Sequence, residues 1–361
     1  MSSASHSVAV GDLRHAVYRL LIGIGLAVLA VTQIVDANAP DFAQDYAAAW
    51  AWWHGRSINA PTSDLLDQCW PQHGFGPLRQ VRQPHPPLAT VLALPFALLP
   101  FTAARLLWCG ISVIAIVAAW QLVRSRIMTC LATVPIWCLA LVLGTHEPLL
   151  FLLIALAVVL LPRAPRLAGV TLGLSIGLKA YPAVLLIGLF IARRWRALIM
   201  AVATAVVVLV ASELVLGIGS TFAWLEYTQE NTAHYVKSSH NGSLVRFVYS
   251  MVKLPPALIA LLLAAALVWP LRSKIQAADP IRPLLPVALL VSPISWRHYM
   301  GLTGLLDLGR FEQLCLFVAG TLAMLTSMKI TGPIPELFVQ FPLVAMLLVL
   351  WAKTALNAGK D

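Results

Sequence analysis

Asp41-Phe-Ala-Gln-Asp-Tyr-Ala-Ala-Ala-Trp50 lies in the first long polar interval of the chain, residues 36–87. Five of the nine aspartates fall in this interval, whereas most of the remaining sequence is apolar. Acidic groups are strongly disfavoured in the hydrocarbon core of a bilayer, so an acidic interval beside apolar runs needs a reason. We therefore predict that residues 36–87 form an active site at the membrane surface.

The composition indicates a polytopic membrane protein. Of the 361 residues, 60% are hydrophobic and 11% are charged, against about 25% charged residues in a typical soluble domain. We predict an all-α, single transmembrane domain over residues 1–361, with outer loops at 36–87 and about 217–253. The net charge of +10 favours contacts with membrane lipids at an anionic leaflet over binding of nucleic acid. The five cysteines are odd in number, so no disulfide framework is expected.

Apolar runs separated by short basic loops define the expected spans. The run 20–35 follows Arg14 and Arg19, and we interpret it as a retained first span with its basic end in the cytoplasm. Several other runs are shorter than the ~20 residues of a full span, so tilted or broken segments are expected among about 10 to 13 spans. The other apolar runs are 88–100, 104–123, 127–143, 149–161, 167–178, 183–192, 197–216, 254–271, 284–293, 300–308, 314–328 and 337–351.

The basic loops are expected to face the cytoplasm, because Lys and Arg accumulate on that side of membrane proteins. Successive loops alternate between the two sides of a membrane when every run crosses it. Placing all the basic loops in the cytoplasm conflicts with this alternation if the run 88–100 crosses the membrane completely. The sequence leaves that conflict open. These loops carry Arg124 and Arg126, Arg163 and Arg166, Arg193 with Arg194 and Arg196, and Arg272 with Lys274.

A short helix on the membrane surface is expected over residues 41–53. Pro40 precedes it, Asp41 can act as its N-cap with Gln44 three residues later, and Gly55 can end it. Four aromatic side chains fall near helical spacing on one face, namely Phe42, Tyr46, Trp50 and Trp53. Trp50, Trp52 and Trp53 are expected to lie at the lipid headgroups.

Asp41 and Asp45 are the carboxylates in this helix that have candidate chemistry. Asp41 is either only a helix cap or a general base next to the hydrocarbon. Asp45 lies four residues later on the same helical face. Two carboxylates placed in this way either share a proton or a metal ion, or form a solvated face.

Polar breaks between apolar runs supply the other candidates. Lys179 either extends to the headgroups or holds a lipid phosphate as a point charge. Arg297 and His298 are candidate ligand groups, because irregular polar backbone at membrane depth is tolerated only beside a protein cavity. A structural kink with an outward-pointing arginine is the alternative. His146 is a weak metal ligand because no second histidine lies at ligand spacing, and we predict no metal site.

Five short motifs, in order along residues 41–299, resemble those of glycosyltransferase family 87. A single motif would carry little weight, whereas five in the right order are a specific match. They are Asp41-Phe-Ala-Gln-Asp-Tyr-Ala-Ala-Ala49 with Gly55 ("DF..YY.AA…G"), His85-Pro-Pro-Leu88 ("YPPL"), Gly177-Leu-Lys-Ala-Tyr-Pro182 ("LK.YP"), Asn241-Gly-Ser-Leu244 with Arg246 ("N.SL…R"), and Ser292-Pro-Ile-Ser-Trp296 with His298 ("SPISW.HH").

The resemblance implies a GT-C glycosyltransferase of the bacterial inner membrane with its active site facing outward. It implies an inverting transfer of a sugar, most often mannose, from a polyprenyl-phosphate donor to a glycolipid or polysaccharide acceptor. No cofactor is expected, and a divalent-metal requirement stays open. The family's essential aspartate corresponds to Asp41, our candidate base. The candidate substrate-binding residues are Asp45, His85, Lys179, Asn241, Arg246, Arg297 and His298.

The chain departs from the family pattern at several of these positions. Asp45 and His85 stand where the family has tyrosines, Tyr299 stands where it has a second histidine, and its "GQ.N" reads Gly144-Thr-His-Glu147. These departures leave the sugar and the acceptor open.

Two other classes of protein fit the apolar runs. A lipid or sugar transporter would place paired charges deep in the bundle and would show an inverted repeat. Its acidic candidates near membrane depth are Glu147, Glu213 and Asp307. A non-catalytic assembly subunit would give no reason for the polar breaks.

Overall fold

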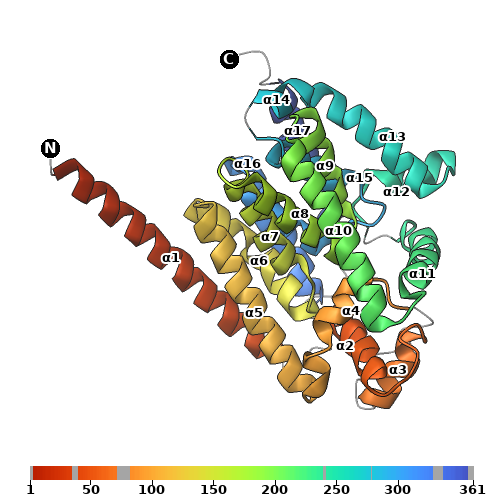
Figure 1. The fold of residues 1–361 in the computed structure, drawn as a ribbon. Coiled ribbons are helices and arrows are strands. Elements are labelled where there is room, and N and C mark those ends of the chain that lie inside the picture. The colour runs from red at the N-terminus through yellow and green to blue at the C-terminus, as the bar shows by residue number, and fades with distance from the viewer. Residues whose placement is uncertain are drawn as a thin grey trace.

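The computed structural model describes residues 3–34, 40–70, 82–238, 241–277, 279–327 and 336–356. Parts of the two expected outer loops, 35–39, 71–81 and 239–240, lie outside the described residues. Every regular element in the described ranges is helical, which confirms the all-α prediction (Figure 1).

The helices differ widely in length, and short 3-10 turns join several of them. The α-helices are α1 (Ser3–Ile34), α2 (Pro40–Trp53), α3 (Thr62–Cys69), α4 (Pro87–Ala93), α5 (Phe101–Leu122), α6 (Ile127–Leu143), α7 (Glu147–Leu160), α8 (Pro165–Leu178), α9 (Leu185–Ile191), α10 (Trp195–Leu216), α11 (Ser220–Tyr235), α12 (Leu244–Val252), α13 (Pro256–Val268), α14 (Arg272–Ala277), α15 (Leu285–Val291), α16 (Arg310–Ser327) and α17 (Glu336–Leu356). The 3-10 elements are η1 (Phe96–Leu98), η2 (Tyr181–Val184), η3 (Trp269–Leu271), η4 (Arg282–Leu284) and η5 (Arg297–Leu305).

Four helices in the described ranges are long and apolar enough to cross a bilayer. They include α5, α10, and parts of α1 and α17. A fifth crossing exists if α12 and the α13–η3 segment, which meet at a bend of 120°, count as one broken span. By length and composition this is fewer than the predicted 10 to 13 spans. The reason is that many apolar runs fold as shorter helices, such as α6 with 17 residues and α9 with 7.

The run 88–100 is too short in its folded form to cross the membrane. It forms α4, with seven residues, and η1, with three, whereas a full span needs about 20. Both elements stay beside α2, because the Tyr46 hydroxyl donates to Leu99 O (2.8 Å) and the Trp53 indole donates to Leu94 O (2.9 Å). The segment therefore returns to the end of the bundle that it left. A complete crossing by the run 88–100, on which the conflict between the basic loops and alternation depended, is thus absent.

Protein covers helix α2 up to Ala51, whereas Trp53 at its end is exposed, and this corrects the prediction of a helix lying along the membrane surface. The side chains of Phe42 and Tyr46 are 1% and 4% exposed. Phe42 stacks on Trp108 of α5 with ring centroids 5.5 Å apart, and Tyr46 packs edge-on against Phe101. The apolar surroundings that we expected lipid to provide for these side chains are thus provided by η1 and the first half of α5.

The observed start and end of α2 agree closely with the ends predicted from the sequence. The helix begins at Pro40, a residue that suits the first helical position, so Asp41 lies in the first turn rather than at the N-cap. At the other end Gly55 adopts a left-handed φ of 63°. Arg56 N then donates to Ala51 O (2.8 Å), which satisfies one of the last carbonyls of the helix.

Helices α8 and α10 pack with their backbones close together. A Cβ atom built on Gly169 would lie 2.3 Å from Ala197 O, and one on Gly173 would lie 2.5 Å from Ala201 O. Glycines at this spacing let two membrane helices approach closely. Only 11% of the apolar window of α10 is buried, so its other side is free to face lipid.

Candidate active site

A cavity of about 730 Å³ lies at the α2 end of the bundle. Its wall combines residues of α2, α6, α11 and α13 with the irregular segments around 84–86, 179–187 and 291–299. Five of the predicted site residues line it, namely Asp41, His85, Lys179, Arg297 and His298. The other three, Asp45, Asn241 and Arg246, lie outside the lining.

Asp41 presents a carboxylate to this cavity. Its side chain is 21% exposed, and its Oδ2 lies 3.9 Å from Nε2 of His298. The backbone of α2 is fixed directly beside it by the burial of Phe42 in the aromatic cluster. The aspartate is therefore held in place and remains reachable from the cavity.

Behind Asp41 lies a buried ion pair that joins the start of α7 to the end of α8. Lys179 Nζ lies 3.0 Å from Glu147 Oε1, and it also donates to the Tyr299 hydroxyl (3.0 Å). Glu147 is completely buried, and its Oε2 lies 3.7 Å from His298 Nε2. Lys179 is buried as well, so it does not extend to the headgroups, and Glu147 compensates its charge.

Sequence reasoning gave Glu147 and Tyr299 no role in the site. Both residues were noticed as departures from the family pattern at two polar breaks far apart in the chain, and Glu147 also as an acidic candidate of a transporter. The contacts of both with Lys179 show that these departures meet in space.

Asn241 joins the second outer loop to the polar break that follows α15. Its Oδ1 accepts from Ser295 N (2.9 Å) and Ser243 N (3.1 Å), and its Nδ2 donates to Pro293 O (2.7 Å). The Arg246 guanidinium donates to the carbonyl of Asn241 (3.1 Å). These two residues therefore shape the cavity wall from behind and do not line it.

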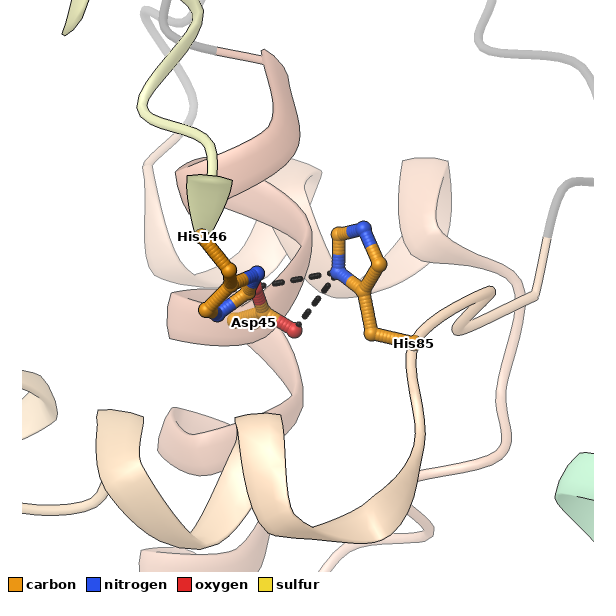
Figure 2. Close-up of side chains that lie close together, drawn as sticks. All are labelled: Asp45, His85 and His146. Atoms are coloured by element: carbon orange, nitrogen blue, oxygen red, sulfur yellow. Dashed lines mark hydrogen bonds and ion pairs between the residues drawn. The ribbon is translucent and has the colours of Figure 1, made fainter. Parts of the chain in front are cut away.

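A second cluster lies beside the cavity and is formed by Asp45, His85 and His146 (Figure 2). His85 Nδ1 lies 3.1 Å from both carboxylate oxygens of Asp45, and His146 Nε2 lies 3.3 Å from Oδ2. Gln83 Nε2 donates to Asp45 Oδ1 (2.7 Å). Sequence spacing gave no sign of this cluster, because α2, the segment before α4 and the α6–α7 turn meet only in the folded chain.

Burial controls the charges in this cluster. It lowers the pKa of His146 to about 4, although the Asp45 carboxylate acts in the opposite direction, so His146 is neutral at pH 7. Burial alone would raise the pKa of Asp45, but the two imidazoles and the hydrogen bonds from His85 and Gln83 hold that pKa below its usual range. Among the described residues, the contacts that stabilise the Asp45 carboxylate come from neighbouring imidazole and amide groups.

A family model, glycosyltransferase family 87, matches residues 84–293, which is more than half of the chain. The chain belongs to glycosyltransferase family 87. This membership agrees with the motif resemblance and makes the protein a membrane glycosyltransferase. The matched residues begin after α2, so the role of Asp41 depends on its motif and on its place in the cavity.

One curated relative is a polyprenol-phosphate-mannose-dependent alpha-(1-2)-phosphatidylinositol mannoside mannosyltransferase from Mycobacterium tuberculosis (strain ATCC 25618 / H37Rv). It is 28% identical over 249 residues, which cover 60% of this chain and 58% of the relative. The match thus spans less than two thirds of the relative's length. No solved structure matches the chain at a significant level.

Proposed function

We propose that this family 87 enzyme transfers mannose from a polyprenyl-phosphate donor to a glycolipid acceptor at the outer face of the bacterial inner membrane, with inversion at the anomeric carbon. The cavity is the observation that carries the proposal. Its lining places Asp41, Lys179, Arg297 and His298 together with apolar side chains of α6, α9 and α13. A lipid-linked sugar phosphate has the same division into a charged group and a long apolar chain. The printed name of the curated relative supports mannose and a polyprenol phosphate.

Asp41 acts as the general base in the proposed reaction. Its carboxylate takes the proton of the acceptor hydroxyl as that oxygen forms a bond to C1 of the sugar. The bond between C1 and the donor phosphate oxygen breaks at the opposite face, and the polyprenyl phosphate leaves with the electron pair. One carboxylate is sufficient because the phosphate is already a good leaving group and needs no general acid.

The leaving phosphate needs electrostatic stabilisation, and cationic groups that line the cavity supply it. Arg297 is the candidate with a permanent charge and several donors. His298 lies next to it and between the carboxylates of Asp41 and Glu147. Lys179 contributes less charge to the phosphate, because Glu147 already pairs with it.

The acidic residues that a transporter would use have other tasks in this structure. Glu147 forms a buried pair with Lys179, as a transporter would require, but the pair lies at helix ends that border the cavity and not within one of the long spans. The Glu213 carboxylate accepts from Thr221 N (2.7 Å) and Ser220 Oγ (3.0 Å) at the start of α11. Asp307 forms an exposed pair with Arg126. These positions favour a transferase over a transport pathway through the middle of the bundle.

The test is sugar transfer by the purified enzyme in lipid nanodiscs. Radiolabelled polyprenyl-phosphate mannose is supplied with a phosphatidylinositol mannoside acceptor, and the product is analysed for the anomeric configuration of the new bond. Transfer with inversion is the expected result. Transfer only from another polyprenyl-phosphate sugar would refute the choice of mannose, and no transfer from any such donor would refute the proposed activity.

A further inference from the structure

Three segments far apart in the sequence bring a carboxylate and two imidazoles together beside the cavity. Asp45 comes from α2, His85 from the segment before α4, and His146 from the turn between α6 and α7 (Figure 2). One ligand atom from each residue lies within 4.8 Å of the other two. All three residues are buried, and Asp45 is only 1% exposed.

Two of the three spacings between these atoms fit a bound transition metal, and the two imidazole nitrogens lie within 4.8 Å of each other. Zinc binds imidazole nitrogens and carboxylate oxygens at about 2.0–2.2 Å, so neighbouring ligand atoms of a tetrahedral centre lie about 3.3 Å apart. The distances from the Asp45 carboxylate are 3.1 Å to His85 Nδ1 and 3.3 Å to His146 Nε2. A cation in the space between the three side chains would reach each of them after small side-chain adjustments.

The neighbouring groups support a metal more than a plain hydrogen-bonded triad. Among the described residues, no Lys or Arg forms an ion pair with the buried Asp45. Gln83 orients the carboxylate by donating to Oδ1, as partners of metal ligands commonly do.

We propose that Asp45, His85 and His146 bind one divalent first-row transition metal, with Zn²⁺ as the first choice. Two imidazoles and one carboxylate suit Zn²⁺ or Fe²⁺ better than Mg²⁺ or Ca²⁺, which prefer oxygen ligands. Of the three ligands only His85 lines the cavity, so the cavity provides the path of entry. The centre joins α2 to the α6–α7 turn and thereby fixes the helix that presents Asp41. The proposal does not depend on which sugar the enzyme transfers.

Metal binding by the purified full-length protein is the test. The protein carries no polyhistidine tag, is stripped with EDTA, and is titrated with Co²⁺ and Zn²⁺ by visible spectroscopy and calorimetry. The expected result is one ion per chain, a d–d absorption band for Co²⁺, and a melting temperature that falls with EDTA and recovers with Zn²⁺. Absence of stoichiometric binding by the wild type overturns the proposal.

Variants locate the bound ion. His85→Gln and His146→Gln are expected to abolish the stoichiometric binding, and Gln83→Ala is expected to weaken it by about 10- to 100-fold. His54→Gln is the matched control, because His54 is an exposed histidine at the end of the same helix α2. This variant is expected to keep wild-type metal binding.

If the ligand variants fail to fold, X-ray absorption at the zinc edge of the wild-type protein identifies the metal ligands instead. Two imidazoles and oxygen in the ligand shell support the site, and any other shell overturns it.

Discussion

Two carboxylates, Asp41 and Glu147, lie near His298, and their surroundings give them different tasks. Glu147 is completely buried, and it pairs with Lys179. Asp41 lines the cavity, and none of the ion pairs in the described ranges joins it to Lys or Arg. A base must reach the acceptor hydroxyl, and removing one partner of a buried pair costs about 3–5 kcal/mol. Glu147 is therefore suited to holding α7 and α8 together, and Asp41 to catalysis.

Asp41→Asn is expected to lower transfer by about 10²–10⁴-fold, the usual contribution of a positioned base. The Asn side chain has nearly the same shape as the Asp side chain but lacks the carboxylate. Loss of a negative charge in the first turn of a helix costs about 0.3–1 kcal/mol at an exposed position and up to about 2 kcal/mol at a partly buried one, so the variant should fold. Asp64→Asn is the control, because Asp64 is exposed and lies in the first turn of α3 in the same loop. Near-normal turnover by folded Asp41→Asn protein would refute the mechanism.

Arg297→Gln is expected to raise the KM for the lipid-phosphate donor by about 10- to 100-fold, as loss of a charged hydrogen bond implies. The KM for the acceptor should change much less. Steady-state kinetics with each substrate varied in turn measure the difference. Arg272→Gln, at an exposed arginine of α14, is the control. An equal rise in both KM values would mean that Arg297 shapes the cavity without contacting the donor.

At the scale of elements, the polar break after α15 depends on one side chain. Asn241→Ala removes the acceptor of Ser243 N and Ser295 N and the donor to Pro293 O. Each buried polar group left unpaired costs about 1–3 kcal/mol. We expect a clear fall in melting temperature together with loss of transfer, since Arg297 and His298 follow this break directly. A stable variant with unchanged activity would show that the break holds its shape without Asn241.

The contact between α8 and α10 gives a second prediction at this scale. Gly173→Ala would place a methyl group 2.5 Å from Ala201 O, and the forced shift of the helices should destabilise the protein by about 1–3 kcal/mol. Gly110→Ala in α5 is the matched control, because a Cβ atom there meets nothing within 4 Å. Thermal unfolding in one detergent compares the two. Equal melting temperatures would mean that moving α8 and α10 apart does not lower the free energy of unfolding.

Sequence patterns predicted individual elements better than they predicted which elements pack against one another. Gly55 and the polar break at Lys179 were found because each has a local chemical signature, and Asn241 was found through its family motif. The surroundings of α2 were assigned wrongly, because aromatic spacing looks the same whether lipid or η1 and α5 cover that face. The cluster of His85 and His146 was missed for a related reason. No local pattern records which two turns the fold brings into contact.

At the scale of the whole molecule, the two ends of the bundle differ in where the acidic group lies. The cavity at the α2 end is lined by Asp41 together with the basic Lys179 and Arg297. The other end has a second cavity of about 720 Å³, whose lining among the described residues contains basic residues from several elements and no acidic residue. They are His15, Arg19, Arg124, Arg126 and Arg310. Because Lys and Arg accumulate on the cytoplasmic side, this distribution supports an outward-facing active site.

Cysteine labelling in intact cells tests this orientation and the shared face of the two outer loops. Ser57→Cys after α2 and Gln229→Cys in α11 place exposed thiols near the cavity, and Ser273→Cys in α14 places one at the basic end. Cys69 is partly exposed and is first replaced by serine. A membrane-impermeant maleimide should label positions 57 and 229 from outside, and position 273 only after permeabilisation. Labelling of 273 alone would mean that the active site faces the cytoplasm. If 57 and 229 label from opposite sides, the two loops cannot border one cavity, and the proposed site fails whatever its orientation.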